Sequence, residues 1–348
     1  MTNALSVDVL NLTGEELRRE FKTFNIERYR ADQVHQWIYE KGVYDFDHMT
    51  NISVPLRETL KKNFKIGMPQ IVEKQNSDGD ESVKLLLKLS SGDLVEAVQM
   101  KADNRRTVCI SSQVGCKFHC AFCASGQAGF FRNLSMGEIV AQILAARDQD
   151  PEKKLTNIVF MGIGEPFDNY TEVMRTVRQL NSKNGLGLGA RRITISTCGI
   201  IPKIEMLVEE NLQVELSVSL HGHNDAVRGS IMPVNKAFPV KDLIEACKKY
   251  VKKTKRAITF EYILVQGVNA SIKEAQGLGR LLEGMLCKVN LIPYNPIQEF
   301  PHEAPTYPEV VAFQKTLQDY GVKTTVRFSK GQDIQAACGQ LRSVRLNK

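Results

Sequence analysis

From about residue 107 to the end of the chain, short apolar runs alternate with longer amphipathic stretches. The apolar runs predict strands and the amphipathic stretches predict helices, because their hydrophobic residues recur with the matching periods. The predicted strands span 107–112, 157–161, 192–196, 214–220, 258–264, 288–292 and 323–328, and the helices include 139–147, 170–181, 240–252, 272–283 and 309–320. Strands that alternate with helices form a parallel sheet. About six such units predict an α/β fold with a partial barrel, open on one side, rather than a closed eightfold barrel.

The first part of the chain has a different pattern. Thr13 and Glu16 form a capping box at the start of the first of three predicted helices, which span 14–21, 31–41 and 56–64. Two strand-like runs follow, and the Ser-Ser-Gly between them predicts a hairpin over 82–89 and 93–100. We therefore divide the chain into a helical module with a β-hairpin over residues 1–95 and a barrel over residues 96–348.

Composition narrows the class of protein. At 348 residues and 43% hydrophobic content, the chain can bury a large core. No apolar run approaches the roughly 20 residues that span a bilayer, and the first residues lack the basic head and apolar run of a signal peptide. We expect a cytoplasmic monomer without a membrane partner. The net charge of +7 is compatible with nucleic-acid binding without establishing it.

Three of the eight cysteines, Cys116, Cys120 and Cys123, follow the first predicted barrel strand. In a reducing cytosol, cysteines this close together indicate metal or redox chemistry rather than disulfides. Three thiolates are one short of the four that usually hold a cubane iron–sulfur cluster, so one iron would stay open to the amine and carboxylate of a ligand. The alternative is a zinc site completed by His119, although zinc sites usually combine two close pairs of ligands.

Small and polar residues follow several other predicted strands. Gly164 and Glu165 come after the second strand, where a glycine lets the backbone approach a ligand and a carboxylate can accept bonds from an ammonium group. The carboxyl ends of parallel strands meet at one edge of the sheet, where α/β enzymes bind their ligands. The further candidates at strand ends are Ser196, Ser219, Leu220, His221 and Asn295.

Two more cysteines and several basic residues complete the candidate site. Cys338 lies in a glycine-flanked segment without apolar periodicity, which predicts a loop and makes its thiol a candidate nucleophile. Cys109 lies in the first predicted barrel strand, and a buried free thiol is its simplest interpretation. The basic residues Arg105, Arg132 and Arg191 flank the predicted catalytic loops, where contacts to phosphates would orient an RNA.

These motifs together resemble the RlmN/Cfr family of radical S-adenosylmethionine enzymes, which methylate adenine in RNA. The resemblance covers nearly the whole chain. It is carried by segments 29–42, 109–116, 131–134, 161–166, 219–221, 290–296 and 333–341, in addition to the cysteine triad.

The resemblance implies a role for each candidate residue. Cys116, Cys120 and Cys123 would bind one [4Fe-4S] cluster. Cys338 would be methylated by one molecule of S-adenosylmethionine, and a 5′-deoxyadenosyl radical from a second molecule would activate that methyl group for addition to the base. Cys109 would then release the product by forming a disulfide with Cys338, with Glu96 as the general base. The implied positions for S-adenosylmethionine are Gly164, Glu165, Ser196, Ser219, Leu220, His221 and Asn295.

The resemblance also implies the substrate and the partners. Segment 333–341 is closer to the RlmN branch, which acts on carbon 2 of adenine, than to the Cfr branch, which acts on carbon 8 and confers antibiotic resistance. We expect 23S ribosomal RNA as substrate, with transfer RNA as a further candidate, and a flavodoxin system as electron donor. Two other hypotheses remain: a radical enzyme acting on a small molecule, and a zinc-bearing RNA-binding protein without enzymatic activity.

Overall fold

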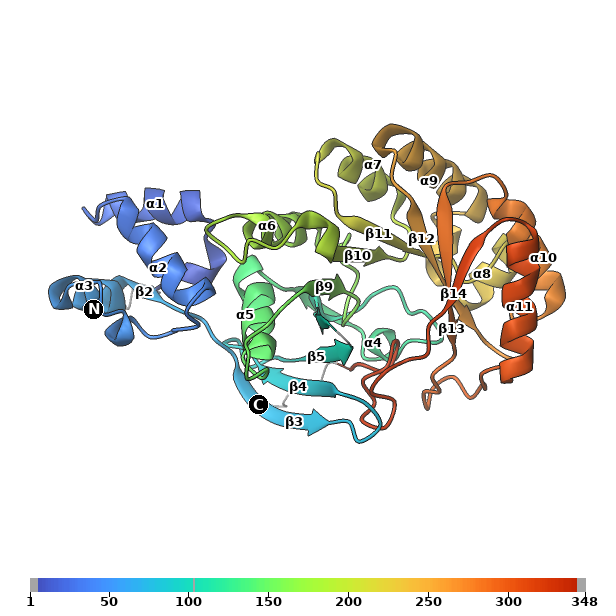
Figure 1. Cartoon of the computed structure of the whole chain (residues 1–348), viewed down its shortest axis with the longest axis horizontal. Helices are drawn as coiled ribbons and strands as arrows, with labels where there is room; N and C mark the ends of the chain where they lie inside the picture. Colours follow the sequence, from blue (N-terminus) through green and yellow to red (C-terminus); the bar gives the residue numbers. More distant parts are fainter. Residues whose placement is uncertain (1–5, 103, 343–348) are drawn as a thin grey trace.

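The computed structural model describes residues 6–102 and 104–342, and its centre is one curved sheet covered by helices (Figure 1). Within the described residues the strand order is β14-β13-β12-β11-β10-β9-β6-β5-β4-β3. The parallel part comprises β6 (Arg105–Cys109), β9 (Asn157–Phe160), β10 (Ile193–Thr197), β11 (Glu215–Ser219), β12 (Ile258–Leu264), β13 (Cys287–Pro293) and β14 (Lys323–Val326). Because β14 ends the order without pairing to another strand, the sheet is a barrel open on one side, as predicted.

Helices cover the outer face of the parallel strands (Figure 1). They are α5 (Met136–Arg147), α6 (Tyr170–Asn181), α7 (Ile201–Glu209), α9 (Val240–Thr254), α10 (Ile272–Leu282) and α11 (Tyr307–Asp319), whereas the short helix α8 (Asp225–Ile231) packs beside the cysteine loop through Ile231. Their apolar faces and the strands form the main hydrophobic core. No helix in the described part of the chain is long and apolar enough to cross a membrane.

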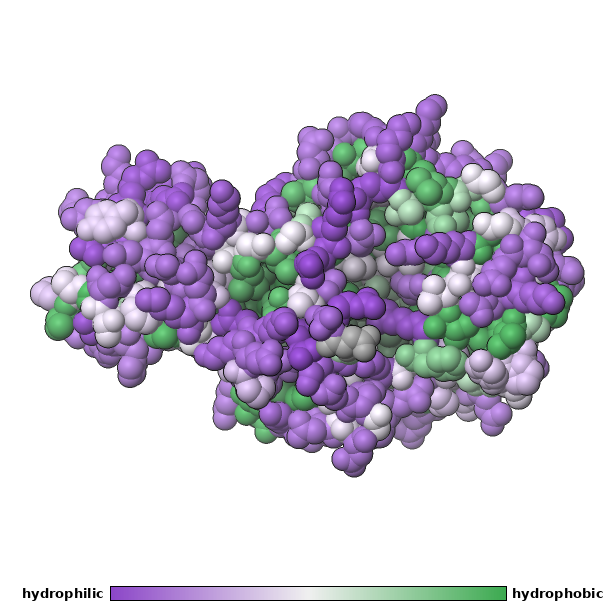
Figure 2. Space-filling model, in the orientation of Figure 1, coloured by the Kyte–Doolittle hydropathy of each residue, from purple (hydrophilic) through white to green (hydrophobic). Residues whose placement is uncertain are grey.

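The helical module contains α1 (Gly14–Thr23), α2 (Tyr29–Tyr39) and α3 (Val54–Asn63) and has a core of its own. The predicted capping box begins α1: the Thr13 backbone N–H donates to the Glu16 carboxylate at 2.8 Å, and the Glu16 N–H donates to Thr13 Oγ1 at 3.3 Å. The module core includes one face of α5 from the barrel, with Val140 and Leu144 fully buried. The module therefore packs directly on the first barrel helix, and its surface in Figure 2 is mostly hydrophilic.

The predicted hairpin is present as β4 (Ser82–Lys88) and β5 (Leu94–Ala102), which pair along the whole length of β4. Since β5 also pairs with β6, the hairpin extends the barrel sheet, and the predicted boundary at residue 95 falls inside β5. The division into two parts stays a proposal. Beyond the hairpin lies β3 (Gln70–Asn76), an exposed edge strand that the sequence did not predict, because its charged residues hide any apolar alternation.

Candidate active site

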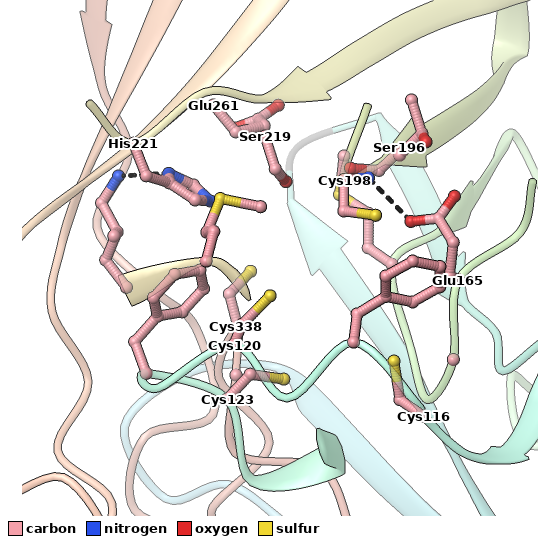
Figure 3. A pocket seen from close by; sticks show the side chains of 18 of the residues that line it. Cys116, Cys120, Cys123, Glu165, Ser196, Cys198, Ser219, His221, Glu261 and Cys338 are labelled. Carbon is pink, nitrogen blue, oxygen red and sulfur yellow. Dashed lines mark hydrogen bonds between the residues drawn. The ribbon is translucent and has the colours of Figure 1, made fainter. Parts of the chain in front are cut away.

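Residues at the carboxyl ends of the parallel strands surround a cavity, which we call the triad cavity because Cys116, Cys120 and Cys123 line it (Figure 3). The cysteine loop runs from β7 (Gln113–Gly115) to the short helix α4 (Ala124–Gln127). It is fixed by backbone hydrogen bonds, including one from Cys116 N–H to the Gly129 carbonyl at 2.9 Å. The triad therefore follows the first parallel strand, as predicted.

The three thiols share a water-poor environment. Burial raises the pKa of Cys116 to about 12, and burial together with the neighbouring thiols raises the pKa of Cys120 well above its ordinary value. Thiolates in such a place require a positively charged group to balance them. Within the described residues, no three His, Cys, Asp or Glu side chains are close enough to hold a single metal ion. A cubane cluster needs no such convergence, because each cysteine binds a different iron atom.

The turn after β9 presents Gly164 and Glu165 to the triad cavity. Gly164 has a φ of +101°, and a Cβ there would lie 2.5 Å from the Cβ of Gln113, so only glycine fits without a shift. The buried Glu165 carboxylate accepts hydrogen bonds from the backbone N–H of Phe167 at 2.9 Å and of Cys198 at 2.7 Å. Burial nevertheless raises its pKa. A cationic ligand would provide the positive charge that stabilises the ionised form of this buried carboxylate.

Ser196 lies next to the end of β10, Ser219 ends β11, and His221 follows β11 by two residues; all three line the triad cavity (Figure 3). His221 Nδ1 accepts a hydrogen bond from the Ile263 backbone at 2.9 Å. Burial lowers the pKa of His221 to about 3, so the ring is neutral and its proton lies on Nε2 as a donor. Leu220 is different: its side chain is fully buried in the main core, and Leu220 is not part of the cavity lining.

Asn295 holds the loop that carries Cys338. Its amide nitrogen donates to Ser329 Oγ at 2.8 Å and to the Cys338 carbonyl at 3.1 Å, and its amide oxygen accepts from Gln332 Nε2 at 2.8 Å. Asn295 is 1% exposed and is absent from the lining of the triad cavity. These contacts make Asn295 a residue that positions the Cys338 loop.

Cys338 lines the triad cavity and also a second cavity, which contains Cys109. Both residues are free cysteines. Burial, followed by the nearby Cys338, raises the pKa of Cys109 to about 12. The fold thus brings together two cysteines that are more than two hundred residues apart in the chain.

Glu96 lies on β5, outside the lining of both cavities. Its carboxylate accepts a hydrogen bond from the Arg342 backbone at 2.8 Å and pairs with Lys84 Nζ at 3.5 Å. Burial raises its pKa. Glu96 therefore contacts the chain four residues after Cys338 rather than Cys338 itself.

Three further ionisable residues line the triad cavity that the sequence did not single out: Cys198, Glu261 and Arg327. Glu261 could have been noticed, because a carboxylate interrupts the otherwise apolar strand β12. Arg327 lies directly after β14, and the nearby Cys338 is the main cause that raises its pKa. No sequence signal distinguishes Cys198 from a buried structural thiol.

The three arginines that were predicted to contact phosphates lie in different environments. Arg132 forms ion pairs with Asp93 at 2.7 Å and Glu138 at 2.8 Å, so it is held within the protein. Arg191 donates to Gln213 at 2.9 Å on the exposed surface. Arg105 is exposed and lines the second cavity.

Comparisons with known proteins agree with this arrangement. Residues 7–66 match the model of the ribosomal RNA large subunit methyltransferase N-terminal domain, and residues 110–276 match the radical SAM superfamily. A protein of Thermoanaerobacter sp. (strain X514), named probable dual-specificity RNA methyltransferase RlmN, is 48% identical over 95% of this chain and 96% of its own. A relative of the same name from Clostridium tetani is 45% identical over 97% and 96%.

The fold of this chain is also similar to that of a solved structure along nearly the whole chain. The crystal structure of a radical SAM methyltransferase from Sphaerobacter thermophilus superposes with a TM-score of 0.94 and 44% identity, over 96% of this chain and 99% of the other. With relatives of this identity along nearly the full length of both chains, the chain belongs to the RlmN family of radical S-adenosylmethionine RNA methyltransferases.

Proposed function

We propose that this chain methylates carbon 2 of an adenine in RNA, with Cys338 as the carrier of the methyl group. One observation carries the proposal: Cys338 lines both the triad cavity and the second cavity that contains Cys109. A carrier must meet the methyl donor and the base in turn, and a residue between two cavities has access to both.

The triad cavity has the donors that its proposed ligands need. Cys116, Cys120 and Cys123 would hold a [4Fe-4S] cluster, which, when bound, supplies the electron that cleaves S-adenosylmethionine. Glu165 would accept from the ammonium group of S-adenosylmethionine, and Gly164 leaves space for the backbone to approach it. The other proposed contacts are Ser196, Ser219, His221 and the backbone of Leu220, while Asn295 would act through the Cys338 loop.

The proposed steps use the side chains of Cys338, Cys109 and Glu96. The Cys338 sulfur attacks the methyl group of a first S-adenosylmethionine, so that a thioether forms as the sulfonium bond breaks. Loss of a hydrogen atom from that methyl group to the radical from a second molecule lets its carbon add to the base. The radical adduct would return the one electron that the cluster had supplied and lose the proton of the base carbon. Cys109 then attacks the Cys338 sulfur, and a disulfide forms as the bond between that sulfur and the transferred methylene breaks; the methylene takes up a proton and becomes the methyl group of the product. Glu96 would accept the proton released from the base, and its raised pKa suits a general base.

Carbon 2 of adenine is electron-poor, so transfer of a methyl cation to it is unfavourable and a carbon radical is needed. The same radical could add at carbon 8, which is the alternative product. We propose ribosomal RNA, and also transfer RNA, as the substrate, and a flavodoxin-type protein as the electron donor in the cytoplasm. The helical module, with the exposed residues Tyr29 and Arg28 on and beside α2, would bind the RNA by its shape and phosphates.

The test is anaerobic reaction of the reconstituted protein with unmodified 23S ribosomal RNA, followed by nucleoside analysis. Formation of 2-methyladenosine that is lost in Cys338→Ala supports the proposal. Formation of 8-methyladenosine would contradict the position on the base. Methylation that persists in Cys338→Ala would contradict the carrier, and a protein that binds zinc but no iron after reconstitution would contradict the radical chemistry altogether.

A further inference from the structure

The turn that joins β3 to β4, residues 77–81, lies against the Cys338 loop, residues 329–342 (Figure 1). The two segments are far apart in the chain, since Ser77 and Asp333, which are hydrogen-bonded, are separated by 256 positions. Contacts between the two segments therefore fix the Cys338 loop to the N-terminal part of the chain.

Each segment offers a carboxylate to the hydrogen-bond donors of the other. The Asp333 carboxylate accepts from Ser77 Oγ at 2.8 Å and from the Asp78 backbone N–H at 2.8 Å. In return, the Asp80 carboxylate accepts from the Gly331 backbone N–H at 2.8 Å. We call these three hydrogen bonds the turn clasp. Because hydrogen bonds to a carboxylate are stronger than those between neutral groups, the turn clasp holds the loop at two points.

Both sides of the turn clasp are closed by hydrogen bonds of their own. In the turn, Ser77 Oγ also accepts from two backbone N–H groups of the same turn, at 3.2 and 3.1 Å. In the loop, the Ala336 N–H donates to the Gly331 carbonyl at 2.8 Å, which closes a tight turn around Asp333. Gly331 has a φ of +64°, which favours glycine. The turn clasp therefore joins two preorganised turns, so that little conformational entropy is lost when it forms.

Cys338 lies between the turn clasp and a second, buried set of contacts. After Cys338, the Gly339 carbonyl accepts from the Ala124 N–H at 2.7 Å, and the Leu341 carbonyl accepts from Ser125 Oγ at 2.7 Å. These contacts tie the end of the loop to α4, directly after the cysteine triad. The turn clasp holds the loop before Cys338, so the two sets of contacts fix the segments on either side of the thiol.

The two segments of the loop face different cavities. Four residues before Cys338 line the second cavity, where Cys109 lies: Ser329, Lys330, Ala336 and Ala337. None of the described loop residues before Cys338 lines the triad cavity, whereas Gly339 after it does. The segment that the turn clasp holds therefore forms the side of the loop that faces Cys109.

We infer that the turn clasp positions Cys338 for the thiol of Cys109, with Asp333 as the positioning residue. This inference rests on the proposed function, in which Cys109 releases the product by forming a disulfide with Cys338. Asp333 is exposed and lines neither cavity, so it acts through the backbone of the loop and not on a ligand. Loss of the turn clasp frees residues 331–337 and lowers the fraction of molecules in which the two thiols meet. Methylation of Cys338 from the triad cavity depends more on the segment held by α4.

The test measures disulfide formation and methylation separately in the same holoenzyme. For the disulfide, protein with unmethylated Cys338 is equilibrated anaerobically with mixtures of reduced and oxidised glutathione, and the pairing of Cys109 with Cys338 is measured by mass spectrometry. The two protein thiols lose two protons and two electrons as their disulfide forms, and one glutathione disulfide takes these up to give two thiols. For methylation, the initial rate of Cys338 modification by S-adenosylmethionine is measured without RNA.

Matched variants separate the turn clasp from general stability. Asp333→Ala removes two of its three hydrogen bonds. Asp333→Asn keeps both partners, because its amide oxygen can accept from the Asp78 N–H and its amide nitrogen can donate to Ser77 Oγ. Ser77→Ala removes one of the two bonds from the other side. Asp319→Ala is the control, since Asp319 is exposed at the end of α11 and lines neither cavity. The urea midpoint of each protein is measured as well.

We expect Asp333→Ala to lower the equilibrium constant for the disulfide by about fivefold, the combined effect of two exposed hydrogen bonds. Its rate of Cys338 methylation should change less than about twofold, and its urea midpoint should stay near that of Asp319→Ala. Asp333→Asn should recover most of the disulfide. Adding Ser77→Ala to Asp333→Ala should lower the disulfide by less than a further factor of about two, because both substitutions remove the same contact.

A wild-type disulfide equilibrium in Asp333→Ala would overturn the positioning role and leave the proposed function standing. Equal losses of disulfide and of methylation in Asp333→Ala and Asp333→Asn, with lower urea midpoints, would show a general structural role and also overturn it. If Cys109 and Cys338 of the wild type do not pair at any glutathione ratio, the release step of the proposed function fails, and the positioning role fails with it.

Discussion

Replacing Asn295 by alanine separates two roles for this residue. The family resemblance suggests a contact to S-adenosylmethionine, whereas the structure shows that Asn295 donates hydrogen bonds to Ser329 and the Cys338 carbonyl and accepts one from Gln332. Each buried hydrogen bond contributes about 1 kcal/mol net, so the substitution should weaken the anchoring of the loop by roughly 3 kcal/mol. That lowers the population of the anchored loop by up to about 100-fold relative to detached states.

The assay measures two rates in the same protein. Methylation of Cys338 depends on the loop and should fall by about tenfold or more. Reductive cleavage of S-adenosylmethionine to 5′-deoxyadenosine without RNA depends on the triad cavity and should change less than threefold on the same reasoning. Limited proteolysis should become faster within residues 329–342. Asn181→Ala is the matched control, because that amide makes one bond, to Leu188, on the outer helix α6.

The opposite pattern would refute the anchoring role. If Asn295→Ala raises the KM for S-adenosylmethionine and abolishes its cleavage while the loop resists proteolysis as before, Asn295 acts on the ligand and not on the loop.

The remaining predictions concern backbone fit and protonation. Gly164→Ala places a Cβ 2.5 Å from Gln113 at a φ of +101°, so formation of 5′-deoxyadenosine should fall by about tenfold or more, whereas Gly189→Ala, with open space around it, should be neutral. Burial lowers the pKa of His35 to about 4, below its unfolded value near 6.5. The stability that the neutral ring contributes is therefore present above pH 6.5 and is lost as pH falls toward 4. The free energy of unfolding should fall by roughly 3 kcal/mol over this range. Urea midpoints should show this loss in the wild type and less of it in His35→Gln; equal acid sensitivity would contradict it. Because burial raises the pKa of Cys109 to about 12, its thiolate fraction grows roughly tenfold per pH unit below that value, and single-turnover product release should accelerate between pH 7 and 9. A flat pH profile of that step would contradict an ordinary thiolate attack.

Much of the fold could be predicted because local signals and tertiary structure agree. The strand–helix alternation after residue 107 predicted the parallel sheet and the open barrel, and the predicted capping box at Thr13 is present. The pairing of β5 with β6 could not be predicted, because it is a contact between a hairpin and a barrel strand that local periodicity does not encode. The edge strand β3 was missed for the same kind of reason, since its register is set by β4 and not by its own apolar residues.

The candidate site was predictable where residues follow strand ends and less so elsewhere. The triad, Glu165 and His221 line one cavity, because parallel strands bring their carboxyl ends together. Asn295 follows the same rule, but all its polar atoms bind the Cys338 loop, which depends on how distant segments pack. Arg327 was missed because nothing in its local sequence shows that it lies beside Cys338.

The most direct measurement follows the methyl group itself. The protein is first methylated on Cys338 with S-adenosylmethionine that carries a deuterated methyl group, then freed of small molecules. It is next given unlabelled S-adenosylmethionine, reductant and RNA for a single turnover. If Cys338 carries the methyl group, the first product is 2-methyladenosine that contains deuterium, and Cys109 and Cys338 are recovered as a disulfide. An unlabelled first product, with the deuterated methyl group still on Cys338, would contradict the role of Cys338 as the carrier.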